Sequence, residues 1–252
     1  MRVAALLLCL SLVAGCQSAA KLEDEAKLAK SAGLHYQLGI DALNKNNMPK
    51  AFDELLRANK LAPERADILD ALGVAWIVRG DLKKAETYYK QALQHSPSAA
   101  TYNNYGGLLM QMGDYAKAET FFRKALDDPR YRNPDLVYIN LGDALVAQGR
   151  FDEAISSYRQ SRRLNPRQEL SRLKEAQAYE QSSRKHYAKA LYEAILREQP
   201  ASRPAMQGLL VLLESSGNLT EARSRLRKFG KQSKNPEDVA WASGELQRLS
   251  RL

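Results

Sequence analysis

Small apolar residues recur along this chain with a period of about 34 residues. Alanine stands at six positions separated by 34, 33, 36, 34 and 34 residues, and a large apolar or aromatic residue follows each alanine four positions later. Residues four apart lie on the same face of a helix, and a period of this length indicates stacked repeats that bury their apolar faces against one another. The six alanines are Ala51, Ala85, Ala118, Ala154, Ala188 and Ala222.

The residues between these alanines predict a helix, a turn and a second helix in each repeat. A glycine precedes four of the alanines by twelve residues, at Gly39, Gly73, Gly106 and Gly142, and we expect two helix backbones to approach there too closely for a larger side chain. Five of the turns carry a residue that tolerates positive φ, and a proline then ends the second helix or begins the next repeat. The expected turn residues are Asn46, Gly80, Gly113, Gly149 and Gly217.

This pattern resembles the tetratricopeptide repeat over about residues 32–236. The resemblance implies an all-α fold, a right-handed superhelical solenoid whose first helices line a concave face. In the last two repeats Ala176 and Leu210 take the place of the glycine, and such atypical units are usual at the ends of an array. The pattern predicts six repeats and a C-terminal capping helix, with boundaries at 32–65, 66–98, 99–134, 135–168, 169–202, 203–236 and 237–252.

The first residues of the chain indicate export. Arg2 precedes an apolar stretch that is too short to span a bilayer as a helix, and small residues then lead to Cys16, which is the layout of a secretory signal over residues 1–15. The sequence Val-Ala-Gly-Cys resembles the bacterial lipobox. This resemblance implies cleavage before Cys16, lipidation of its thiol, a polar tether over residues 16–31 and, because Gln17 is uncharged, an anchor on the periplasmic face of the outer membrane. The alternative is an ordinary secretory signal with an incidental cysteine.

The composition fits a folded protein and offers little chemistry for catalysis. The 252 residues are 44% hydrophobic and 27% charged, with three histidines and two cysteines, which excludes disorder throughout and a disulfide-rich scaffold. No nucleophile, phosphate-binding or metal-ligand motif occurs, and His35 takes the place of a core aromatic residue. We therefore expect no catalytic residue, no metal and no cofactor, and a protein that is not an enzyme.

Apolar residues that repeat packing does not claim mark the expected partner-binding groove on the concave face. In the first repeat three large side chains form a stripe at helical spacing, and two more extend it in the second repeat. Exposed apolar patches tend to be interaction sites. The alternative is that residues 17–31 fold over the stripe and bury it. The predicted groove residues are Tyr36, Ile40, Leu43, Val74, Ile77, Asn104, Asn140 and Asp143.

The groove turns polar in the middle repeats. Asn104 and Asn140 occupy the same position in adjacent repeats, and they resemble the asparagine pair with which some tetratricopeptide arrays hold the backbone of a bound peptide. An amide both donates to a carbonyl and accepts from an N–H, so it suits sequence-tolerant binding of an extended chain. The alternative is that these asparagines are simply solvated.

Positive charge is concentrated late in the chain. The formal net charge is +9, and residues 222–234 contain no acidic residue. An exported lipoprotein meets little nucleic acid, so we predict no nucleic-acid partner. We predict instead that the basic C-terminal region contacts anionic lipid or cell wall; helix faces that are simply solvated are the alternative.

A lipobox, a short tether, six repeats and a C-terminal helix together resemble the PilF/PilW family of type IV pilus lipoproteins. By that resemblance the protein is a pilotin, which binds secretin subunits and promotes their outer-membrane localisation and multimerisation. The alternative is a tetratricopeptide lipoprotein that acts as a scaffold for peptidoglycan synthases or hydrolases, or in outer-membrane assembly.

Overall fold

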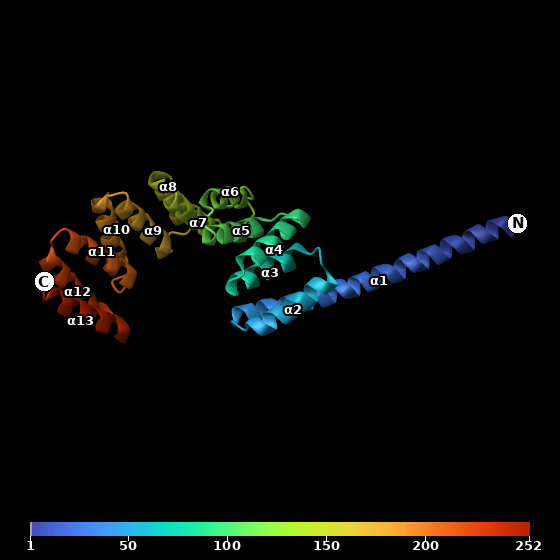
Figure 1. The fold of residues 1–252 in the computed structure, drawn as a ribbon, viewed down its shortest axis with the longest axis horizontal. Coiled ribbons are helices and arrows are strands. Elements are labelled where there is room, and N and C mark those ends of the chain that lie inside the picture. The colour runs from blue at the N-terminus through green and yellow to red at the C-terminus, as the bar shows by residue number, and fades with distance from the viewer. Residues whose placement is uncertain (1) are drawn as a thin grey trace. The chain divides into compact units, whose positions relative to one another are not determined.

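The computed structural model describes the backbone of residues 2–252 and the side chains of residues 22–252. The residues so described form thirteen helices and no strand (Figure 1). The signal peptide over residues 1–15 and the lipidation of Cys16 fall outside the described side chains and stay predictions. The helices are α1 (Arg2–Asn44), α2 (Met48–Leu61), α3 (Ala66–Val78), α4 (Leu82–His95), α5 (Ala99–Gln111), α6 (Tyr115–Leu126), α7 (Pro134–Ala147), α8 (Phe151–Leu164), α9 (Glu169–Gln181), α10 (Lys185–Glu198), α11 (Arg203–Ser215), α12 (Leu219–Gln232) and α13 (Pro236–Leu249).

The chain divides into two compact units, Met1–Gly113 and Asp114–Leu252. In the first unit α1 packs against α2, α3 packs against α4, and α3 also contacts α5. In the second unit α7 packs against α8, α9 against α10, and α12 against α13. The all-α fold is confirmed, and its helices pack pairwise as the repeat pattern predicts; the number of repeats stays a prediction. Within the described part of the chain, no helix has the length and apolar character that a membrane span requires.

The five expected turn residues all have positive φ. Asn46 has a φ of 55°, and the four glycines have values between 73° and 86°. The residue after three of these glycines, Gly80, Gly149 and Gly217, closes the helix end; for example, the amide of Asp81 donates to the carbonyl of Trp76 at 3.0 Å. A sixth turn of the same kind contains Ser183, whose φ is 62°. The sequence did not reveal it, because serine has no preference for this conformation.

Three of the four glycines that the repeat pattern singled out, Gly39, Gly73 and Gly142, lie against large side chains of a neighbouring helix. A Cβ added to Gly73 would lie 2.8 Å from Cζ of Tyr89, and one added to Gly39 would lie 2.6 Å from Cγ of Leu55. Gly142 meets the ring of Tyr158 in the same way. The expectation of a close approach is confirmed at these three glycines, where the nearest atoms belong to a side chain and not, as predicted, to a backbone; at Gly106 it stays a prediction.

The last helix, α13, packs on α12 through aromatic and polar contacts. Trp241 meets Phe229 edge to face, with ring centroids 5.6 Å apart. Ala242 and Leu249 are buried, and the guanidinium of Arg223 donates to the carbonyl of Leu249 at 2.6 Å. These contacts hold the predicted C-terminal helix against α12.

Replacing Ser183 by glycine should stabilise the protein. A non-glycine residue in the left-handed region costs about 1–2 kcal/mol, and glycine loses part of that gain through its more flexible unfolded state. We expect Ser183→Gly to raise the free energy of unfolding by about 0.5–1 kcal/mol in urea titrations. Gly149→Ser, the reverse change in the corresponding turn, should lower it; equal stability of the two variants would contradict this account.

Candidate functional site

The predicted apolar stripe on α1 belongs largely to the core of the first unit. Tyr36, Ile40 and Leu43 are half-buried and pack against a cluster that includes Phe52 and Leu72. The premise that repeat packing leaves these three residues free is therefore wrong, because α2 and α3 approach closely enough to cover one side of the stripe. Only its outer edge is open to a partner, and binding there stays a prediction.

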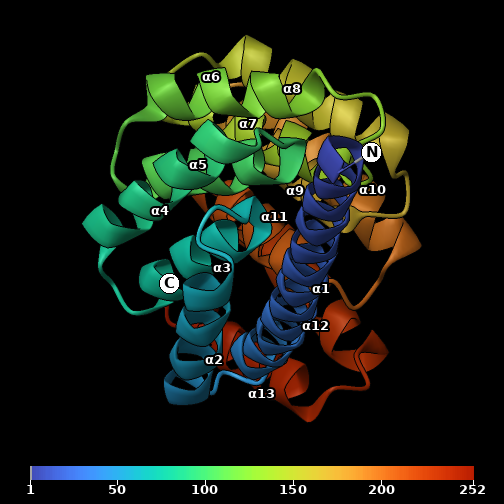
Figure 2. The ribbon, with the colours of Figure 1, turned by 90° about the vertical axis from the view of Figure 1, so that its right-hand side faces the viewer.

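The N-terminal part of α1 does not cover this stripe. Residues 22–30 are exposed and continue the axis of α1 beyond the end of α2 (Figures 1 and 2). The alternative, in which residues 17–31 fold over the stripe and bury it, is therefore wrong for residues 22–30. The tether that the sequence predicts is helical over its described part.

A polar groove lies beside the stripe in the first unit. A cavity of about 550 Å³ is lined by Tyr36 of α1, Asp67 and Asp70 of α3, and Thr101 of α5, among others. Val74 and Ile77 are half-buried on α3. The helices α1, α3 and α5 are the first helices of the first three predicted repeats. The groove therefore lies on the side of the first unit where we predict that a partner binds.

Asp70 is the most unusual side chain in this groove. The Nδ2 of Asn104 donates to its Oδ2 at 2.8 Å, while its Oδ1 is buried and has no hydrogen-bond partner among the described residues. Burial raises the pKa of Asp70 to about 6, although hydrogen bonds from Asn104 and Thr101 act in the opposite direction. Asn104 is therefore held by an acid and not simply solvated, which fixes its amide at the groove.

The hydroxyl of Tyr89 lies close to Asp70. Its ring tip rests on Gly73, one helical turn after Asp70, and its hydroxyl is buried without a partner in the described structure. Burial, and next the carboxylate of Asp70, raise the pKa of this phenol. The first unit thus holds two buried oxygens without hydrogen-bond partners among the described residues, one on Asp70 in the groove wall and one on Tyr89 behind it, and each such oxygen costs stability.

The second unit holds the other predicted groove residues. Asp143 is half-buried and accepts hydrogen bonds from the hydroxyl of Tyr158 at 2.7 Å and from Nζ of Lys174 at 3.0 Å. Asn140 is half-buried one turn earlier on α7. Asn104 and Asn140 belong to different units, so their action as a pair stays a prediction, and Asp143 is engaged in holding α8 and α9 to α7.

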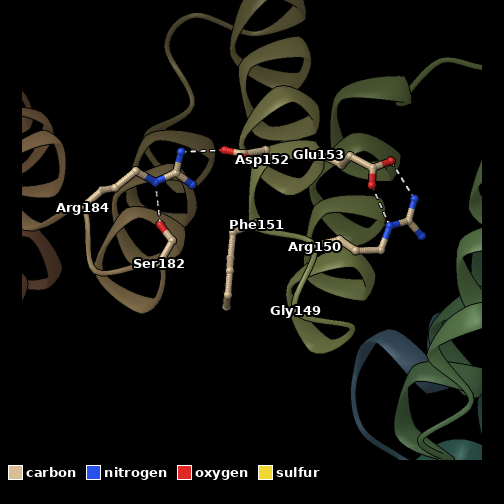
Figure 3. Close-up of a pocket in the computed structure, with 7 residues that line it drawn as sticks. All are labelled: Gly149, Arg150, Phe151, Asp152, Glu153, Ser182 and Arg184. Atoms are coloured by element: carbon tan, nitrogen blue, oxygen red, sulfur yellow. Dashed lines mark hydrogen bonds and ion pairs between the residues drawn. The ribbon is translucent and has the colours of Figure 1, made fainter.

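A second hollow, of about 510 Å³, lies at the turns that precede α8 and α10 (Figure 3). Arg184 bonds Asp152 at 2.5 Å and Oγ of Ser182 at 2.9 Å, and Arg150 forms a two-pronged ion pair with Glu153 at 2.7 and 2.6 Å. Because these charges pair with one another, the hollow offers no uncompensated group to a ligand, and we assign it a structural role.

The expectation for His35 is also corrected. Its Nδ1 lies 2.6 Å from a carboxylate oxygen of Glu54, and its side chain is about a quarter exposed. This histidine therefore makes a polar contact between α1 and α2 and does not replace a core aromatic residue. Within the residues that the structure describes, no group of three His, Cys, Asp or Glu side chains is arranged to hold a metal.

Comparison with known proteins supports the reading of the repeats. Models of the tetratricopeptide repeat match residues 66–99 and 97–167. Residues 66–167 of this chain therefore match tetratricopeptide repeats. The chain is 30% identical over 149 residues to the Type IV pilus assembly protein PilF of Pseudomonas aeruginosa (strain PAO1), a match that covers 59% of this chain and 57% of that relative.

Two solved structures of pilus proteins share the fold. The structure of Pseudomonas aeruginosa PilF aligns with a TM-score of 0.70 at 23% identity, over 87% of this chain and 99% of the PilF chain. That of PilW, described as a widely conserved type IV pilus biogenesis factor, aligns with a TM-score of 0.73 at 20% identity, over 83% and 96% of the two chains.

Replacing Asp70 by asparagine should stabilise the protein at neutral pH. Folding raises the pKa of Asp70 from 3.8 to about 6, so the stability that this group contributes is present below the lower value and is lost as the pH rises through the higher one. We expect Asp70→Asn to raise the free energy of unfolding by about 2 kcal/mol above pH 7 and by much less near pH 4.

Urea titrations at several pH values measure this difference. Asp53→Asn, which changes an exposed acid on α2 paired with Arg57 at 3.1 Å, is the matched control and should show no comparable rise. A constant or inverted difference between Asp70→Asn and the unchanged protein would contradict the assignment of a costly buried carboxylate.

Proposed function

We propose that this chain acts in type IV pilus assembly as an outer-membrane lipoprotein that binds secretin subunits and promotes their outer-membrane localisation and multimerisation. One observation carries the proposal: the sequence similarity to the pilus assembly protein PilF coincides with a fold that aligns over 99% of the PilF chain. Other tetratricopeptide proteins share the fold, so the sequence similarity is what favours pilus assembly over another role.

In this proposal the lipid on Cys16 supplies the membrane location. Two or more acyl chains anchor a protein firmly, whereas one is marginal. The residues that follow Cys16 belong to α1, whose exposed part over residues 22–30 separates the anchor from the part of α1 that packs on α2. The binding surface then lies away from the headgroups, where a subunit in transit can reach it.

The groove of the first unit supplies the binding surface. The outer edge of Tyr36 and the half-buried Val74 and Ile77 offer apolar contact, while Asp70 and Asn104 offer polar contacts to a peptide backbone. No covalent chemistry is needed, because bringing subunits together at the membrane raises their effective concentration and so favours multimers. This is consistent with a protein that is not an enzyme.

Complementation of a gene deletion tests the proposal. We expect the deletion to abolish twitching motility and secretin multimers, the unchanged gene to restore both, and Cys16→Ser to give protein that no longer fractionates with the outer membrane and restores multimers poorly. Immunoblots for secretin multimers in membrane fractions provide the readout.

The outcomes separate the alternatives. Intact pili and secretin multimers in the deletion strain, with altered cell shape, would contradict the pilotin role and favour a scaffold for cell-wall enzymes. Retention of the Cys16→Ser protein in the outer membrane would contradict lipidation alone and leave the pilus role to the deletion result.

A further inference from the structure

The basic residues of the second unit fall into two classes that the sequence does not distinguish. Arg159 and Arg162 both bond the buried carboxylate of Glu175, at 2.7 and 3.1 Å. Arg172 pairs with Glu198 at 2.5 Å. These ion pairs link neighbouring helices and neutralise the charge of the three arginines, so these residues do not contribute to a surface that attracts anions.

A second class lies on one side of α12 and is exposed. Arg227, Lys228 and Lys231 of this helix are exposed, and Lys234 follows just beyond its end. Lys231 lies four residues after Arg227 and three after Lys228, which places the three on the side of α12 opposite the buried Ala222, Leu226 and Phe229. In the ion pairs of the described residues none of these four takes part, whereas Arg225 of the same helix is bonded to Glu193 at 2.8 Å.

A small cavity continues this face toward α10. It has a volume of about 200 Å³, and Arg197 of α10 and Lys228 and Gln232 of α12 line it. The carboxylate of Glu193 also lines it, but its charge is compensated by Arg225 at 2.8 Å. The buried apolar side chains of Met206 and Phe229 also line this cavity. A hollow with cationic and amide donors at the rim and apolar side chains below suits a phosphate group with the first carbons of its ester.

We propose that this surface docks on the phosphate groups of anionic lipid. It is called here the α12 basic face and consists of Arg227, Lys228, Lys231 and Lys234 at α12, together with Arg197 of α10. A row of cations along a helix matches a surface of repeated anions better than it matches a single carboxylate. Each cation near such a surface raises the binding constant about fivefold. Four or five cations together therefore attract the chain to the surface far more strongly than a single one.

This inference rests on the proposed function in one respect, namely that the anchor on Cys16 brings the chain to a membrane. Once the chain is tethered, even weak lipid binding becomes effective, because the local concentration of headgroups is high. The α12 basic face would then hold the second unit against the membrane surface and restrict its orientation.

Vesicle flotation tests the inference without the anchor. The mature chain carrying Cys16→Ser is mixed with vesicles of phosphatidylcholine alone or of phosphatidylcholine with phosphatidylglycerol. We expect binding to the anionic vesicles at low ionic strength, little binding to the neutral ones, and loss at ~0.5 M salt, where screening is strong. Lys228→Glu with Lys231→Glu should weaken binding to anionic vesicles at least about tenfold.

The matched control is Lys50→Glu with Lys60→Glu, which changes the net charge equally at two exposed lysines of α2. It should bind nearly as well as the unchanged chain. Equal weakening by both double variants would overturn the α12 basic face in favour of a net-charge effect. Failure to bind anionic vesicles, with retention on immobilised polyglutamate, would overturn lipid in favour of an acidic protein partner. Neither outcome affects the secretin test, which measures multimers in cells.

Discussion

The contact between a large side chain of one helix and a glycine of its neighbour governs how the helix pairs of this protein form. In the first unit Tyr89 rests on Gly73 and Leu55 on Gly39; in the second, Tyr158 rests on Gly142 and Tyr192 on Gly208. These four large side chains are essentially inaccessible to solvent. Since no Cβ fits between the partners, the distance and rotation between the two helices are set at this one point, and the remaining side chains pack around it.

The same contact carries polar groups across the helix pair. A tyrosine that crosses over a glycine places its hydroxyl beyond the backbone of the neighbouring helix. There the hydroxyl of Tyr158 donates to Asp143 at 2.7 Å, whereas that of Tyr192, which contacts Gly208 of α11, donates to Glu180 of α9 at 2.6 Å. Tyr89 emerges near Asp70 without a partner. The tyrosine hydroxyl thus has a hydrogen-bond partner at these two contacts of the second unit and none among the described residues at Tyr89 of the first. We expect a partner to bind in the first unit, where the hydroxyl is unsatisfied.

The sequence was sufficient for features that one residue type controls. Positive φ requires glycine or asparagine in most turns, so Asn46 and the four turn glycines were predictable, whereas Ser183 was not. Spacing alone located the helices. Spacing did not distinguish a free apolar stripe from one that a neighbour covers, since Tyr36 and Leu43 fill the same helical face in either case.

Pairing between charges was also beyond the sequence. Arg162 and Lys228 contribute equally to the net charge, yet the first bonds a buried acid and the second does not, because only the fold places Glu175 beside α8. Gly208 escaped notice for a similar reason: it meets Tyr192 of the preceding helix pair, outside the register that the other glycines share.

A comparison of Gly73→Ala with Gly107→Ala tests the central role of the side chain on glycine most directly. Both glycines are helical, but nothing lies within 4 Å of a Cβ added to Gly107. In urea titrations, Gly73→Ala should lower the free energy of unfolding by about 2 kcal/mol through overpacking against Tyr89. Gly107→Ala should raise it by up to about 1 kcal/mol through helix propensity. Equal stabilisation by both changes would show that the contact does not control the packing of the helix pairs.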